Sequence, residues 1–349
     1  MPAVKAANPR QIFGNDDWKA ITSVSGWRGM WLVVHGWLVV ALAAFGGAAA
    51  WDYHWLAGLL VTPFVLAILG GRQLGLAILM HDGAHGLLHP NRKLNNWLGE
   101  WPSGAAVGSD LQSYRAYHLT HHRFTQQPED PDLGLSAPFP TSSASLWRKV
   151  VRDLTGQTFY KQRSSQFRMA ATGISALLKG APEAAKRSTV AGTPFNKQTQ
   201  SSNGLGPSDA AGIAVAKTVG RFLAVQTILL TLSLSLWGWT PYLLWLVALA
   251  TTFQLFLRVR NIAEHACTTT GSDNPFTHAR TTYANMLERT TVAPYWVNYH
   301  SEHHLFMGVP CYNLPRAHAL LGGGGYQPQM TIEPSYHSVL RRVTATLPA

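Results

Sequence analysis

The 349-residue sequence is poor in charged side chains and in cysteine. Only 13% of its residues are charged, about half the share found in ordinary soluble domains, while 46% are hydrophobic. So much apolar surface excludes a disordered chain. With only Cys267 and Cys311, the chain cannot be a disulfide-rich scaffold. Acidic residues are also scarce: 17 Asp and Glu stand against 28 Lys and Arg, and the net charge of +11 suits either nucleic acid or a membrane surface.

Long stretches without any charge favour the membrane. Residues 29–51 and residues 53–71 contain no charged side chain, and each run is long enough for one spanning helix of roughly 20 residues. Residues 222–257 are also uncharged, but Trp237-Gly238-Trp239-Thr240-Pro241 interrupts them with helix breakers and interfacial aromatics. Core helices of a soluble protein are a weaker interpretation of paired runs of this length. We therefore predict an all-α integral membrane protein with four transmembrane helices in two hairpins.

The positions of the basic residues predict the orientation of these hairpins. Of the 28 Lys and Arg, 15 lie between residues 72 and 197, and neither hairpin turn contains one. Short loops rich in Lys and Arg stay on the cytoplasmic side. Both termini and the long central loop are therefore expected in the cytoplasm, with the protein in a bacterial inner membrane. Because topology explains the basic residues and no nucleic-acid module is recognisable, we expect no nucleic-acid partner.

The uncharged runs and the segments between them predict a single domain, residues 1–349, with a cytoplasmic helical cap on the two hairpins. Residues 141–210 are rich in Ser, Thr, Lys and Gly, which predicts a mobile insert near residues 190–208. The expected divisions are a cytoplasmic lead-in (1–28), the first hairpin (29–80), a cytoplasmic region with the insert (81–210), the second hairpin (211–260) and a second cytoplasmic region (261–349).

Ten of the fifteen histidines fall in four short clusters. Spacings of three and four residues place side chains on one face of a helix. One His-x-x-His-His sequence is expected by chance with a probability of about 0.03 in such a chain, so two of them indicate a metal site. The clusters are His81-Asp82-Gly83-Ala84-His85 with His89 nearby, His118-Leu119-Thr120-His121-His122, Asn261-Ile262-Ala263-Glu264-His265, and His300-Ser301-Glu302-His303-His304.

The clusters lie at or just beyond the cytoplasmic ends of the predicted spans, so they can meet in one layer. A transporter would instead place its ligands within the spans, near the midplane, and the uncharged runs contain only His35 and His54 among the histidines. One tetrahedral zinc takes four ligands, whereas nine convergent histidines match two metal ions. Imidazole suits Zn, Cu, Fe and Ni alike, so this reasoning leaves the metal open. Carboxylates that orient the rings are expected nearby. The candidates are Asp82, Glu264, Glu302 and the run Glu129-Asp130-Pro131-Asp132.

At these residues the sequence resembles the membrane fatty acid desaturase family, which also contains hydroxylases and ketolases. Arg260 to His265 is similar to the family's additional ligand segment, and Asn298 to Phe306 is similar to its last histidine box. His89 lies outside the family's ligand set. The four-helix, two-hairpin plan is also the family's. By position, the resemblance implies two irons held by His81, His85, His118, His121, His122, His265, His300, His303 and His304, with Asn261 binding one iron directly or through water.

The resemblance also implies an activity. Such enzymes use O2 as co-substrate and remove two hydrogens from an unactivated chain, with electrons from a ferredoxin-like or small haem carrier. The first hypothesis is therefore a di-iron desaturase that introduces a double bond into a lipid acyl chain. The alternative within enzymes is a di-iron hydroxylase or ketolase acting on a carotenoid, sphingolipid or alkane. A remote alternative is a non-enzymatic metal-binding membrane protein.

Overall fold

The computed structural model describes residues 3–178 and 209–345, so the insert predicted near residues 190–208 lies outside the described residues. Within them, four segments are long and apolar enough to cross a membrane, namely residues 15–53, 55–85, 211–236 and 240–265. The predicted all-α membrane class is confirmed. The helices of the spans are α3 (Gly26–Tyr53), α4 (Trp55–His85), α11 (Asp209–Leu236), α12 (Thr240–Ala250) and α13 (Thr252–His265).

The two hairpin turns lie where the aromatic and helix-breaking residues predict them. His54 is extended (φ −167°) between α3 and α4, and its side chain accepts a hydrogen bond from the backbone of Leu56 and so caps α4. Gly238, with φ +110°, lies between α11 and α12. The last span is less regular than its sequence suggests, because Thr251 (φ −122°, ψ −83°) separates α12 from α13. Two helices with different axes therefore build that span.

The other elements surround these spans. A π-helical turn, residues 100–104, joins α5 to α6, and single 3-10 turns precede α15, α16 and β2. The strands β1 and β2 form one short parallel pair. The remaining bounds are α1 (Pro9–Ile12), α2 (Asn15–Thr22), α5 (Arg92–Gly99), α6 (Ala105–Val107), α7 (Leu111–Phe124), α8 (Leu133–Ser136), α9 (Ser143–Leu154), α10 (Gln157–Leu178), β1 (Arg280–Thr282), α14 (Met286–Thr290), α15 (His300–Leu305), α16 (Leu314–Gly323), β2 (Thr331–Glu333) and α17 (Tyr336–Thr344).

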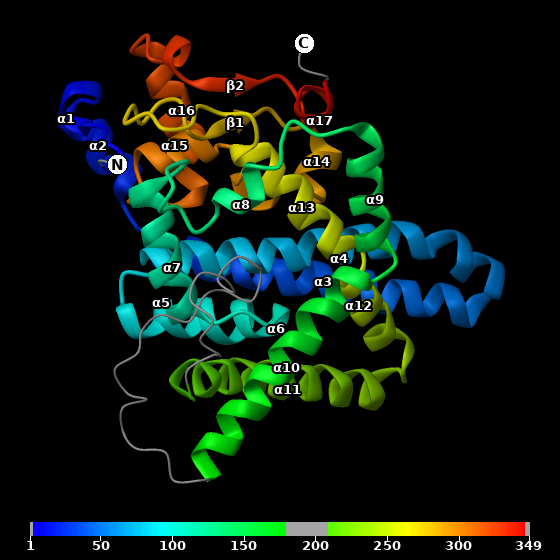
Figure 1. Ribbon diagram of the computed structural model, residues 1–349. Coiled ribbons are helices and arrows are strands. Elements are labelled where there is room, and N and C mark those ends of the chain that lie inside the picture. The colour runs from blue at the N-terminus through cyan, green and yellow to red at the C-terminus, as the bar shows by residue number, and fades with distance from the viewer. Residues whose placement is uncertain (1–2, 179–208, 346–349) are drawn as a thin grey trace.

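Figure 1 shows the hairpin α3–α4 across the middle of the molecule, with one group of elements on each side of it. On one side, α11 packs against α10. On the other side lie α13 to α17 and the two strands. The helices α4, α7, α13 and α15, which carry the histidine clusters, come together on that second side.

Buried amide side chains link the spans to one another. The Nε2 of Gln73 donates to the carbonyl oxygen of Trp245 at 2.9 Å, and the indole nitrogen of Trp245 donates to Gln226 at 3.0 Å. Gln226 in turn donates to the carbonyl oxygen of Ala106 at 3.1 Å. Hydrogen bonds between membrane helices contribute about 1 kcal/mol each. This chain of hydrogen bonds connects α4, which carries His81 and His85, to α12, α11 and α6.

Close packing of α3 against the loop after α4 gives a first testable prediction. A Cβ on Gly29 would lie 1.9 Å from the carbonyl oxygen of Leu88, whereas a Cβ on Gly46 of the same helix would meet nothing within 4 Å. Gly29→Ala should therefore lower the free energy of unfolding by about 1–3 kcal/mol, the usual cost of overpacking. Gly46→Ala is the matched control and should not lower it. Thermal unfolding in detergent measures both; equal midpoints for the two variants would contradict the packing.

Candidate metal centre

Five histidines from three helices form a first cluster. Their ligand nitrogens all lie within 4.8 Å of one another. The Nε2 of His122 lies 2.9 Å from that of His118 and 3.0 Å from that of His303. Two nitrogens bound at right angles to one metal ion at about 2.1 Å are about 3.0 Å apart, so these separations suit a shared ion. The members are His81 and His85 of α4, His118 and His122 of α7, and His303 of α15.

Four further histidines form a second cluster beside the first. His121, His265, His300 and His304 have their ligand nitrogens within 4.8 Å of one another. The Nε2 of His265 lies 2.9 Å from that of His300 and 3.2 Å from that of His121. The two clusters adjoin, because the ring centroids of His122 and His304 are 4.2 Å apart. The structure thus brings together all nine histidines that the sequence predicts.

Helix geometry explains how each His-x-x-His-His segment contributes histidines to both clusters. Successive residues are about 100° apart around a helix, so a residue four positions on is offset by about 40° and one three positions on by about 60° in the opposite sense. His118 and His122 accordingly point into the first cluster, while His121 points into the second. In α15 the same rule pairs His300 with His304 in the second cluster and sends His303 to the first.

The chemistry of the donors suits metal ions. The Nε2 atoms of His81, His85 and His304 are buried and have no hydrogen-bond partner among the residues that the structure describes. Burial, reinforced by the neighbouring imidazoles, lowers the pKa of His118 and His303 well below 6.5. Both rings are therefore neutral at physiological pH, the form that binds metals. Convergent neutral imidazoles with unpaired buried nitrogens form a site that a pair of metal ions would complete.

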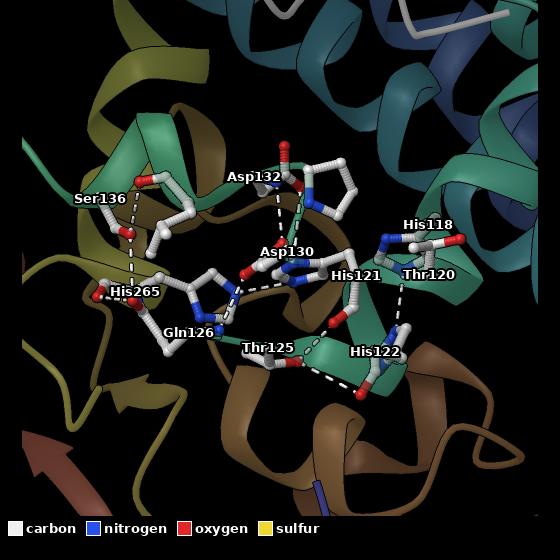
Figure 2. Close-up of polar contacts among 12 residues, drawn as sticks. His118, Thr120, His121, His122, Thr125, Gln126, Asp130, Asp132, Ser136 and His265 are labelled. Carbon is white, nitrogen blue, oxygen red and sulfur yellow. Dashed lines mark hydrogen bonds and ion pairs between the residues drawn. The ribbon is translucent and has the colours of Figure 1, made fainter. Parts of the chain in front are cut away.

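The second cluster has hydrogen-bond acceptors behind its rings. His121 donates from Nδ1 to Asp130 at 2.7 Å, as Figure 2 shows, and Asp130 also accepts from the backbone of Gln126 at 2.8 Å. His265 donates from Nδ1 to the carbonyl oxygen of His278 at 3.0 Å. Each contact fixes a tautomer in which Nε2 carries the free lone pair. Burial alone would lower the pKa of His121, but the charge and hydrogen bond of Asp130, together with the charges of Asp132 and Glu264, outweigh burial and raise it.

The three carboxylates predicted inside the boxes take different positions. An Asp82 oxygen lies 3.4 Å from Nδ1 of His81, and a Glu264 oxygen lies 3.3 Å from Nδ1 of His300. Neither contact is a hydrogen bond, and Glu264 forms an ion pair with Arg260, so both carboxylates lie beside a ring of the centre without fixing its orientation. Glu302 points elsewhere: it accepts from Thr281 at 2.5 Å and lies 2.6 Å from Nδ1 of His318. Glu302 therefore anchors α15 to its surroundings instead of contacting a ring of the two clusters.

Asn261 lines a small cavity at the second cluster. The cavity has a volume of about 20 Å³, enough for one water molecule. Asn261 shares it with His121, His265 and His300, and with the acidic residues Asp130, Asp132 and Glu264. The side-chain oxygen of Asn261 accepts a hydrogen bond from Arg260 at 3.1 Å. The third histidine of the first segment, His89, lies outside both clusters and accepts from the backbone of Asn91.

Three supporting residues escape the sequence analysis. Thr125 donates to the carbonyl oxygen of His121 at 2.7 Å (Figure 2). Gln126, at φ +60°, donates from its side chain to the carbonyl oxygen of His265 at 2.7 Å and so connects α7 to α13. The backbone nitrogen of Cys311 donates to Asp82 at 2.9 Å. Thr125 and Gln126 lie three and four positions after His122, which is a usable signal, whereas Cys311 lies 229 positions from its partner.

The contact between Asp130 and His121 gives a second prediction. Asp130→Asn keeps the shape of the side chain but removes the charge behind the ring, so metal affinity and activity should fall about 10–100-fold. Glu129→Gln is the matched control, because Glu129 is the exposed neighbour of the buried Asp130. Metal titration of the purified variants measures the effect. Equal affinities for the two variants would mean that Asp130 does not support the metal centre.

Spans and site together define a membrane protein with two adjoining histidine clusters. The fatty acid desaturase family model matches residues 53–332, and the chain belongs to this family of oxidoreductases. It is 33% identical to a beta-carotene ketolase from Paracoccus sp. (strain PC1) over 109 residues, 31% of this chain and 40% of that protein. It is 24% identical to a dihydrorhizobitoxine desaturase from Bradyrhizobium elkanii over 266 residues, 73% of this chain and 66% of that protein. The chain thus covers less than two thirds of each relative.

Proposed function

We propose that the protein is a di-iron, O2-dependent desaturase that introduces a double bond into a lipid acyl chain. The observation that carries this proposal is the pair of adjoining clusters, five histidines in one and four in the other. A single zinc would use only four such ligands. Family membership favours iron among the metals that imidazole binds.

In this proposal the first iron is held by His81, His85, His118, His122 and His303, and the second by His121, His265, His300 and His304 with Asn261. When bound, the two irons supply the oxygen chemistry: O2 takes two electrons and two protons besides the two hydrogens of the substrate, and leaves as two waters. The cavity beside Asn261 has room for a water through which that side chain reaches the metal.

The protein's own residues prepare the site for this chemistry. Asp130 and the carbonyl oxygen of His278 hold the Nδ1 protons of His121 and His265 and so aim Nε2 at the metal. Seven of the nine histidines are buried, which keeps bulk water away from the reacting groups. A site on spanning helices can take a lipid chain laterally from the bilayer. Histidine ligands leave the metal charge uncompensated, and the carboxylates of Asp82 and Asp130, which lie behind His81 and His121, offset part of it.

The proposed orientation follows from the basic residues. Both termini and the metal centre face the cytoplasm of a bacterium with the protein in its inner membrane, because neither hairpin turn contains Lys or Arg. Electrons arrive from a ferredoxin-like or small haem carrier. A net charge of +11, concentrated outside the spans, steers an acidic carrier to this face.

A second candidate function is a di-iron ketolase or hydroxylase. The similarity to a beta-carotene ketolase favours it, with 33% identity over 109 residues. The same metal ligands suit desaturation and oxygen insertion alike, because the product depends on where the substrate carbon lies relative to the metals. Mass spectrometry separates them, because desaturation removes two hydrogens whereas hydroxylation adds one oxygen.

The function is tested by expressing the gene in a host with a known lipid and carotenoid profile. We expect a new unsaturated acyl chain, absent from cells that express His303→Ala at equal protein level. A product that has gained one oxygen, with or without the loss of two hydrogens, would favour the second candidate. Unchanged lipids and carotenoids with intact, iron-loaded protein would contradict both.

A further inference from the structure

The hairpin formed by α9 and α10 exposes large apolar side chains. Trp147, Val151 and Leu154 recur at the i, i+4 and i+7 positions of α9, so they share one face, and they are 65%, 38% and 42% exposed. Tyr160 and Phe167 of α10 are 73% and 43% exposed. Isolated apolar residues at a surface are common, but a helical stripe of large apolar residues, with more of them exposed on the helix packed beside it, marks an interaction surface.

Both helices of this hairpin are attached where the charge-free spans end. Arg258, the first charge after the uncharged run 222–257, forms an ion pair with the buried Asp153 of α9. At the other end of that run, the guanidinium of Arg163 in α10 lies 4.7 Å from the ring centroid of Phe222. The hairpin therefore lies level with the boundary between the hydrocarbon layer and the headgroups.

Basic side chains accompany the apolar stripe. Trp147, Arg148, Val151 and Arg152, together with Ser145, line a groove of about 430 Å³ on α9. Arg148 and Arg152 are exposed and one helical turn apart, and neither has an ion-pair partner among the described residues. The acidic residue of α9, Asp153, is buried and occupied by Arg258. The exposed charge of α9 is therefore entirely positive.

We propose that the α9–α10 hairpin lies on the membrane surface and that the groove on α9 binds an anionic phospholipid. Arg148 and Arg152 contact the phosphate, while Trp147 and Val151 dip into the acyl region below it. Apolar side chains on one face with arginines beside them are the pattern of an interfacial helix, whose long basic side chains extend to the headgroups. An acidic protein would also suit the arginines, but not an apolar stripe level with the ends of the spans.

Native mass spectrometry of the detergent-purified full chain tests lipid binding, with phosphatidylglycerol and phosphatidylcholine as probes. The wild type should retain a phosphatidylglycerol molecule in preference to phosphatidylcholine. Since each basic residue near a membrane contributes roughly a fivefold gain for anionic lipid, Arg148→Gln/Arg152→Gln should lower this retention about tenfold or more. Arg10→Gln/Arg123→Gln removes the same charge from exposed positions on α1 and α7, and should leave it unchanged.

A second measurement locates Trp147 itself. In nanodiscs, brominated phosphatidylglycerol should quench the fluorescence of the wild type more than that of Trp147→Phe. Phosphatidylglycerol retention that is equal in the wild type and in Arg148→Gln/Arg152→Gln would overturn the proposal, and so would equal quenching. If that double variant keeps its lipid but loses electron transfer from an acidic carrier, the groove is a protein docking site and the proposal is wrong.

Discussion

Replacing His303 with alanine should abolish product formation and reduce the bound metal. Its Nε2 lies 3.0 Å from that of His122, and both belong to the five-histidine cluster. Removing a residue that only orients a ligand costs about 10–100-fold, so losing a ligand should lower activity by more than about 100-fold. The metal content should fall from about two ions per chain toward one, because the four histidines of the second cluster remain.

His337→Ala is the control for this experiment. His337 lies exposed on α17, outside both clusters, so its replacement should leave metal content and rate unchanged. Product formation and elemental analysis on the same preparations give both readouts. If His303→Ala retained two metal ions and normal turnover, His303 would not be a ligand and the five-histidine cluster would be wrongly composed.

Removing the metal should destabilise the whole protein. Without ions, buried nitrogens such as Nε2 of His81 and His85 are left with no partner. A ligand present at a thousandfold excess over its dissociation constant stabilises the folded state by about 4 kcal/mol. At about 2–4 °C per kcal/mol, chelation should lower the unfolding temperature by about 8 °C or more.

Thermal unfolding in detergent, before and after treatment with a strong chelator, measures this effect. Adding Fe²⁺ back should restore the original midpoint. His303→Ala, which starts with an incomplete first cluster, should show a smaller decrease on chelation than the wild type. A midpoint that does not respond to chelation, in protein shown to have lost its metal, would mean that the clusters are stable without ions.

The fold was largely predictable because the membrane imposes a simple rule on the chain. Runs without charge such as residues 29–51 must be buried in lipid, and Trp and Pro near residues 237–241 can only lie at a turn. The break at Thr251 was not predictable, since nothing in the local sequence distinguishes Thr251 from Thr252. Likewise, the attachment of α9 to the last span depends on Asp153 and Arg258, which are 105 positions apart.

The candidate site was predictable to the level of residue type and cluster. Spacing alone gathers ten histidines in four clusters, because helix periodicity fixes which side chains share a face, and the family resemblance then leaves out His89. How they divide between two centres follows from the opposite offsets of His121 and His122 around α7, once the structure places α15 beside it. Long-range partners gave no signal: the carbonyl oxygen of His278 behind His265, and the backbone of Cys311 beside Asp82, are matters of tertiary packing.

The proposed function depends on a pair of iron ions held by the two histidine clusters. Elemental analysis of the purified wild-type protein, combined with X-ray absorption at the iron edge, tests it most directly. We predict about two irons per chain, each surrounded by imidazole nitrogens, with four or five such ligands on average. One zinc per chain, or iron bound without histidine, would contradict the account.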